Sequence, residues 1–106
     1  MRIQQKISKV IEALRPYKPE KIYLFGSWAC GEGDELSDLD LVVIKRTRAR
    51  FLSRLQQVAG LLPLSLGGID ILVYTPQEFA RMQKEGNAFV EMILDEGKLI
   101  YGRQTQ

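Results

Sequence analysis

The chain has 106 residues and a nearly balanced charge, with 15 Lys and Arg against 13 Asp and Glu. This length fits a single domain over residues 1–106, and a net charge of +2 gives no reason to expect direct binding of nucleic acid. The absence of histidine excludes Ser-His and Cys-His nucleophilic mechanisms and any zinc site that uses histidine.

Cys30 is the only cysteine, so an internal disulfide is impossible and a reducing compartment is expected. Residues 1–6 are polar and charged rather than typical of a signal peptide, and no apolar run is long enough to span a bilayer. We therefore expect a cytoplasmic protein that does not enter a membrane.

The first half of the chain is expected to begin with an amphipathic helix that ends before Pro16. Its apolar face consists of residues at helical spacing: Ile3, Ile7, Val10, Ile11 and Leu14. Residues 22–25 form a β-prone run that stops at Gly26, and residues 38–44 predict a second strand. The basic run from Lys45 to Arg54 is interpreted first as a solvated loop and helix start.

The second half predicts a helix over residues 51–62, closed by Pro63, and a third strand over residues 69–74. The segment Thr75 to Glu78 combines a capping box with proline at the first helical position. The helix that follows is expected to break near residues 86–87, and residues 99–101 predict a last short strand. The expected order α-β-α-β-α-β-α-(β) indicates an α/β (α+β) fold with a single sheet and flanking helices.

Acidic residues interrupt two of the predicted strands. Asp38 and Asp40 are two positions apart, so both carboxylates project to the side opposite Leu39 and Leu41. Asp70 likewise faces away from the apolar residues on either side of it. If the two strands are neighbours, three carboxylates converge, and oxygen ligands of this kind suit Mg²⁺.

The dipeptide Gly26-Ser27 follows the first strand and is a candidate phosphate site. Glycine permits a close approach of the backbone, and the hydroxyl and amides of a tight turn bind phosphate without a cationic side chain. Each feature alone has a simpler interpretation, because a Gly-Ser pair is usually a turn and an Asp-x-Asp pair is often solvated. Together they indicate metal-assisted phosphoryl or nucleotidyl transfer.

Residues 25–31, FGSWACG, followed by residues 37–43, SDLDLVV, resemble the signature of the DNA polymerase β-like nucleotidyltransferase superfamily. The resemblance covers nearly the whole chain, whose size and C-terminal pattern are similar to the minimal nucleotidyltransferase (MNT) members. It implies a nucleotidyltransferase fold with a mixed sheet. It also implies that Gly26 and Ser27 hold the phosphates of ATP, that Asp38 and Asp40 bind Mg²⁺, and that Asp70 is the third catalytic acid and shares a metal.

The MNT resemblance further implies a partner, a HEPN-type helical ribonuclease toxin, with this chain as the antitoxin that transfers AMP to a tyrosine of the toxin. The 106 residues offer no acceptor pocket, so we expect a partner chain to supply the acceptor. The sequence leaves open the oligomeric state, the acceptor and the base preference.

Two alternatives remain. Cys30 stands where the family commonly has arginine, which favours an antitoxin that acts by occlusion alone with a vestigial nucleotide site. The other alternative is the catalytic subunit of a small-molecule or RNA nucleotidyltransferase whose substrate-binding subunit is a separate chain.

Overall fold

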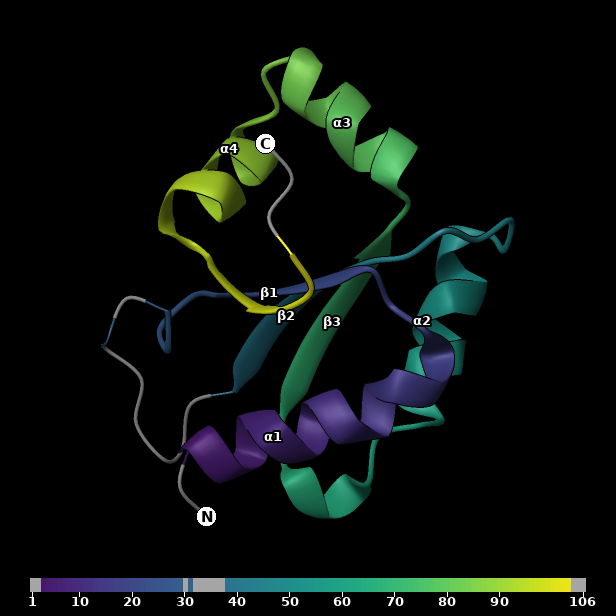
Figure 1. Cartoon of the computed structure of the whole chain (residues 1–106), viewed down its shortest axis with the longest axis vertical. Coiled ribbons are helices and arrows are strands. Elements are labelled where there is room, and N and C mark those ends of the chain that lie inside the picture. The colour runs from purple at the N-terminus through teal and green to yellow at the C-terminus, as the bar shows by residue number, and fades with distance from the viewer. Residues whose placement is uncertain (1–2, 30, 32–37, 104–106) are drawn as a thin grey trace.

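The computed structural model describes residues 3–29, 31 and 38–103. A four-stranded sheet separates two pairs of helices, with α1 and α2 on one face and α3 and α4 on the other (Figure 1). The elements are, in chain order, α1 Ile3–Leu14, the 3₁₀ turn η1 Arg15–Tyr17, β1 Lys21–Phe25, β2 Leu39–Ile44, α2 Phe51–Ala59, the 3₁₀ turn η2 Leu64–Leu66, β3 Ile69–Tyr74, α3 Pro76–Lys84, α4 Ala88–Glu96 and β4 Lys98–Tyr101. The predicted α/β fold with one sheet is confirmed.

The strands lie in the order β3-β2-β1-β4. β2 and β3 are parallel and are connected through α2, while β1 is antiparallel to both β2 and β4. The sheet is therefore mixed, as predicted. The element order differs from the expected alternation, because the described residues between β1 and β2 form a turn at 27–29 rather than a helix, and β3 is followed by two helices.

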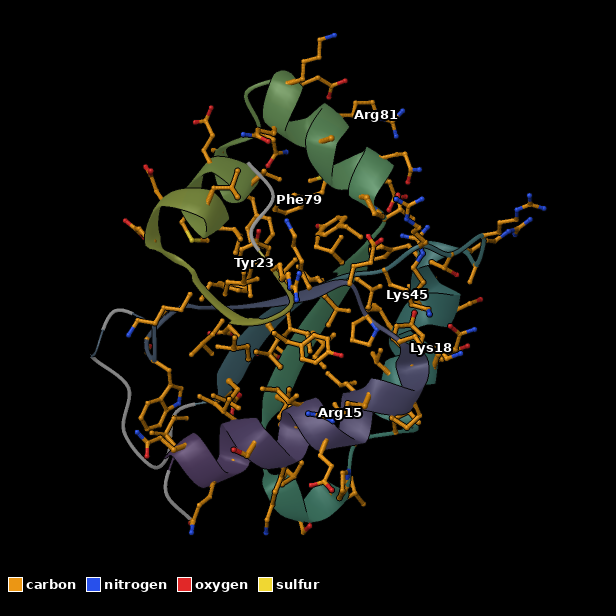
Figure 2. All side chains as sticks on the ribbon, viewed as in Figure 1. Arg15, Lys18, Tyr23, Lys45, Phe79 and Arg81 are labelled. Carbon is orange, nitrogen blue, oxygen red and sulfur yellow. The ribbon has the colours of Figure 1, made fainter. Side chains whose placement is uncertain are left out.

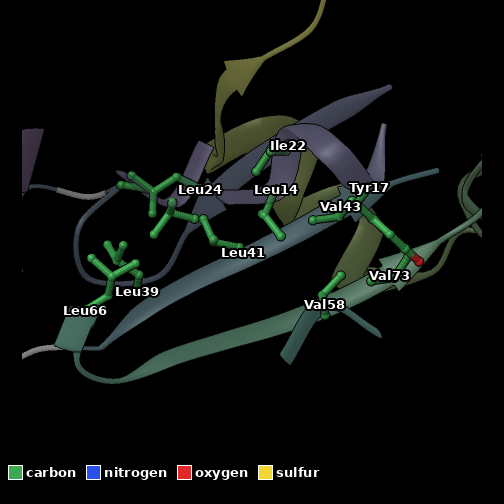
Figure 3. Packing of buried hydrophobic residues seen from close by; sticks show 12 residues of the cluster. Leu14, Tyr17, Ile22, Leu24, Leu39, Leu41, Val43, Val58, Leu66 and Val73 are labelled. Atoms are coloured by element: carbon green, nitrogen blue, oxygen red, sulfur yellow. The ribbon is translucent and has the colours of Figure 1, made fainter. Parts of the chain in front are cut away.

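Alternation along β2 divides its side chains between two hydrophobic clusters. Leu39, Leu41 and Val43 belong to the cluster on the α1 and α2 side, which Figure 3 shows in close view. Val42 and Ile44 belong to the cluster under α3 and α4, where the rings of Tyr23 and Phe79 stack 6.0 Å apart (Figure 2). The predicted facing of this strand is confirmed, and it places Asp40 on the α3 and α4 side.

The expectation that the basic run is a solvated loop and helix start is wrong at both of its ends. Lys45 is half-buried and donates to the carbonyl oxygen of Tyr17, and Arg54 is buried. Arg54 is only 6% exposed, and its guanidinium donates to Glu78 Oε1 at 2.6 Å and to the carbonyl oxygens of Ala49 and Val73. Glu78 also completes the predicted capping box with Thr75, accepting from its N–H at 2.8 Å. One ion pair thus ties α2 to the start of α3. Among the described helices, none is long and apolar enough to cross a membrane.

Replacing Glu78 with alanine should lower the free energy of unfolding by about 2–3 kcal/mol at neutral pH, less than for a fully buried pair because Glu78 is partly exposed. The hydrogen bond from Arg54 is the main reason that the pKa of the Glu78 carboxyl lies below its ordinary 4.5. A lowered pKa stabilises the fold above the unfolded pKa, and this contribution is lost as pH falls through the folded pKa. Urea unfolding at several pH values checks this, with the exposed Glu85→Ala as control; equal losses in both variants would contradict it.

Candidate active site

Asp40 and Asp70 lie side by side at the starts of two neighbouring strands. The parallel register of β2 and β3 pairs these residues, and the antiparallel register of β1 and β2 pairs Asp40 with Phe25 on its other side. Because paired residues project from the same face of a sheet, Phe25, Asp40 and Asp70 form a row across three strands. The strand adjacency expected for Asp70 is confirmed.

Asp38 precedes β2 directly and reaches the same region. It is exposed, whereas Leu39, between the two acids, is completely buried. The carboxylate of Asp38 lies against Gly68, just before β3: a Cβ atom at Gly68 would overlap its Oδ1 and lie 3.0 Å from its Oδ2. Glycine at position 68 therefore leaves the space that the Asp38 carboxylate occupies.

Gly26 ends β1 with a positive φ of 76°, a conformation that favours glycine. A Cβ atom at this position would overlap Oδ2 of Asp40 and lie 3.2 Å from its Cγ. The chain then forms a turn at residues 27–29, in which the N–H of Ala29 donates to the carbonyl of Gly26 at 3.1 Å. The exposed Ser27 thus begins a turn that is directly beside the Asp40 carboxylate, and its role in binding phosphate stays a prediction.

The pKa of the Asp40 carboxyl is raised above its ordinary 3.8. Burial is the largest cause, followed by repulsion from Asp70, a hydrogen bond with Asp70 that favours the protonated form, and repulsion from Asp38. Phe25 on one side of Asp40 packs edge-on against Phe89 of α4 and contributes apolar surroundings. Asp38 and Asp70 therefore both act electrostatically on Asp40, and these three residues make up the acid cluster.

Replacing Asp70 with asparagine should lower the pKa of Asp40 toward 3.8, because a neutral amide removes the repulsion of a second carboxylate. A raised carboxyl pKa costs stability as pH rises from the unfolded pKa through the folded one, so the variant should also lose less stability over that range. Carbon-13 NMR of the side-chain carboxyls, as a function of pH without metal, measures the pKa of Asp40 in the wild type and in the variant. An unchanged Asp40 pKa in Asp70→Asn would contradict this coupling; the exposed Asp95→Asn is the control.

The donor set fits a magnesium ion. All three groups are carboxylates, and their mutual repulsion is the situation that a bound divalent cation relieves. Within the described part of the chain, no three acidic or cysteine side chains converge closely enough to enclose a metal unaided. Magnesium commonly uses one or two carboxylates and completes its shell with water and substrate phosphates, so an open arrangement suits an ion that arrives with a nucleotide.

A cavity among the described residues lies away from these acids. It has a volume of about 970 Å³ and lies against the opposite ends of β1 and β2, where Lys21, Ile44 and Pro76 line it. Its one acidic lining residue, Glu20, is paired with Arg46 at 2.8 Å. Without paired carboxylates, this cavity offers no chemistry for nucleotidyl transfer, and the acid cluster remains the candidate active site.

A family model described as polymerase beta, nucleotidyltransferase matches residues 5–106. The chain belongs to the polymerase β nucleotidyltransferase family. Enzymes of this family use nucleoside triphosphate donors with a divalent metal. A comparison with curated proteins found no match.

Several solved structures, among them a nucleotidyltransferase and toxin–antitoxin complexes, share the fold of this chain. A Sulfolobus solfataricus protein described as a nucleotidyltransferase is 21% identical, with a TM-score of 0.65 over 92% of this chain and 79% of its own. A toxin–antitoxin complex with AMP-PNP contains a chain 25% identical, with a TM-score of 0.62 over 92% of this chain and 74% of that one. The tri-AMPylated Shewanella oneidensis HEPN toxin in complex with its MNT antitoxin gives 23% identity and a TM-score of 0.57, over 95% and 73% of the two chains. The predicted nucleotidyltransferase fold is confirmed, and its neighbours include MNT antitoxins.

Four of the predicted site residues, Gly26, Asp38, Asp40 and Asp70, are thus brought into one cluster, with Ser27 at its edge. Cys30 lies outside the described residues, so its effect stays a prediction from sequence. Gly68 is a residue of the site that the sequence analysis does not identify. The Gly67-Gly68 pair before β3 is the available signal, because glycine in such a place often marks a close approach of the backbone to another group.

Proposed function

We propose that this chain transfers AMP from ATP to a hydroxyl group in a magnesium-dependent reaction, and that the acceptor is a tyrosine of a HEPN-type toxin. The observation that carries the proposal is the row in which Asp40 and Asp70 are paired across parallel strands, with Asp38 beside them. Family membership supports nucleotidyl transfer. The neighbours containing AMP-PNP and an AMPylated HEPN toxin support the donor and the partner.

Each residue has a distinct role in this proposal. Ser27 and the amides of its turn would hold the triphosphate, while Gly26 keeps the backbone close to Asp40. Asp38 and Asp40 would hold magnesium, with Asp70 as a further ligand. The ion would supply positive charge for the phosphates and for the attacking and leaving oxygens.

The reaction requires little covalent chemistry from the protein. The acceptor hydroxyl attacks the α-phosphorus of ATP, the bond from that phosphorus to the bridging oxygen breaks, and pyrophosphate leaves. Asp70, the most exposed member of the row, would take the hydroxyl proton, since a solvent-facing carboxylate is open to an acceptor that approaches from another chain.

Incubation of this chain with a HEPN-type toxin as the candidate partner, with ATP labelled in the α-phosphate and with magnesium, tests the proposal. We expect label on a tyrosine of the partner, identified by mass spectrometry of its peptides. Neutralisation of the partner without label would favour an antitoxin that acts by occlusion. Label on RNA or a small molecule instead would favour the catalytic subunit of an RNA or small-molecule nucleotidyltransferase. Either result would overturn the proposed acceptor.

A further inference from the structure

Lys6 connects the first helix to the strand that carries Asp70. Its Nζ donates a hydrogen bond to the carbonyl oxygen of Gly68 at 3.2 Å. The same ammonium lies against Gly67, where a Cβ atom would be 3.4 Å from it. In Figure 1 the N-terminal part of α1 passes below the start of β3 and beside η2.

The carbonyl of Gly68 is shared by two donors. Besides Lys6, it accepts the backbone N–H of Leu39 at 3.1 Å, a hydrogen bond that joins the start of β2 to the residue before β3. Leu39 stands between Asp38 and Asp40, and Gly68 stands two residues before Asp70. One acceptor therefore lies between the segments that carry all three acids.

The helix that holds Lys6 is itself anchored. Val10 and Leu14 are completely buried in the cluster under α1, and Ile7 packs against that cluster. Among the described residues, the hydrogen bond of the Lys6 ammonium goes to the carbonyl oxygen of Gly68. A cation on a fixed helix thus holds a backbone atom of the site.

We infer that Lys6 is a positioning residue, which fixes the entry to β3 against the start of β2 and so sets Asp70 opposite Asp40. Its effect on catalysis rests on the proposed function, whereas its effect on the backbone does not. Small displacements of catalytic groups are costly, because the reacting atoms must be held within a narrow range of positions. Lys6 acts on the reaction through the acids, without touching the substrate.

Amide hydrogen exchange measured by NMR tests the backbone role in the full chain. Lys6→Met keeps most of the side-chain stem and removes the ammonium, and Lys9→Met removes an exposed lysine from the same helix. In Lys6→Met, the Leu39 amide should exchange about tenfold faster, the effect expected for losing one charged hydrogen bond to its acceptor. Amides between β1 and β2 should be unchanged, and Lys9→Met should match the wild type.

The kinetic consequence is measured with the same variants. Lys6→Met should lower kcat about tenfold with the KM for ATP unchanged, and Lys6→Arg, which can still donate to the carbonyl, should restore most of it. Unchanged exchange at Leu39, or equal acceleration in all strands, would overturn the positioning role. Accelerated exchange at Leu39 in a protein whose wild type transfers no nucleotide would support the positioning role and contradict the proposed function.

Discussion

Replacing Asp38 and Asp40 together with asparagine should reduce nucleotide transfer by about a thousandfold or more, because neutral amides bind magnesium weakly and the site loses several kcal/mol of charge stabilisation. The fold should be unaffected or slightly stabilised. Asparagine has the size of aspartate, and the change removes two carboxylates from a place where burial and the neighbouring acids disfavour the charged form of Asp40. Transfer of labelled AMP at saturating ATP and magnesium measures the first effect, and thermal unfolding measures the second.

The matched control is Asp95→Asn, which makes the same chemical change at an exposed residue of α4, away from the acid row. This variant should transfer nucleotide at the wild-type rate. If the double variant kept more than about a tenth of the wild-type activity, the acids would not be the metal ligands.

Replacing Gly26 with alanine should have the second large effect, a loss of transfer of about a hundredfold or more, as expected when a catalytic group is displaced by about an ångström. The added methyl group would occupy the position of Asp40 Oδ2, so the carboxylate must move. The backbone also has a positive φ of 76°, and alanine costs about 1–2 kcal/mol in that conformation. Both stability and transfer should therefore fall.

Gly86→Ala separates these two causes. Gly86 has a nearly equal φ of 73°, and a Cβ atom there would have only Glu91 Oε1 nearby, at 4.0 Å. Both variants should lose a similar free energy of unfolding, measured with urea. Transfer of AMP, assayed under conditions in which both variants are folded, should be lost only in Gly26→Ala. Equal transfer in the two variants would show that the space beside Asp40 is not needed.

Much of this architecture could be predicted because it depends on local patterns. The alternation of Leu39, Leu41 and Val43 fixes which way Asp40 points, and the capping residues at Thr75 and Glu78 mark where α3 begins. The strand periodicity around Asp70 shows its facing in the same way. These signals need only neighbours in the sequence, and the structure confirms each of them.

The remaining features depend on contacts between distant segments. Nothing near Lys6 in the sequence indicates that its ammonium reaches Gly68, and nothing near Asp38 shows that its carboxylate fills the space at the same glycine. Arg54 was grouped with solvated basic residues because its partner, Glu78, comes from another helix. Such pairings follow from the order β3-β2-β1-β4, which local periodicity does not determine.

The central claim is that Asp38, Asp40 and Asp70 form the site that binds a nucleoside triphosphate together with magnesium. Calorimetric titration of ATP into the wild-type chain and into Asp40→Asn, each with magnesium and with excess EDTA, tests it most directly. We expect magnesium-dependent binding to the wild type and a loss of at least tenfold in affinity in the variant, equivalent to about 1.4 kcal/mol. Equal magnesium-dependent affinities in the two proteins would contradict the assignment of this site.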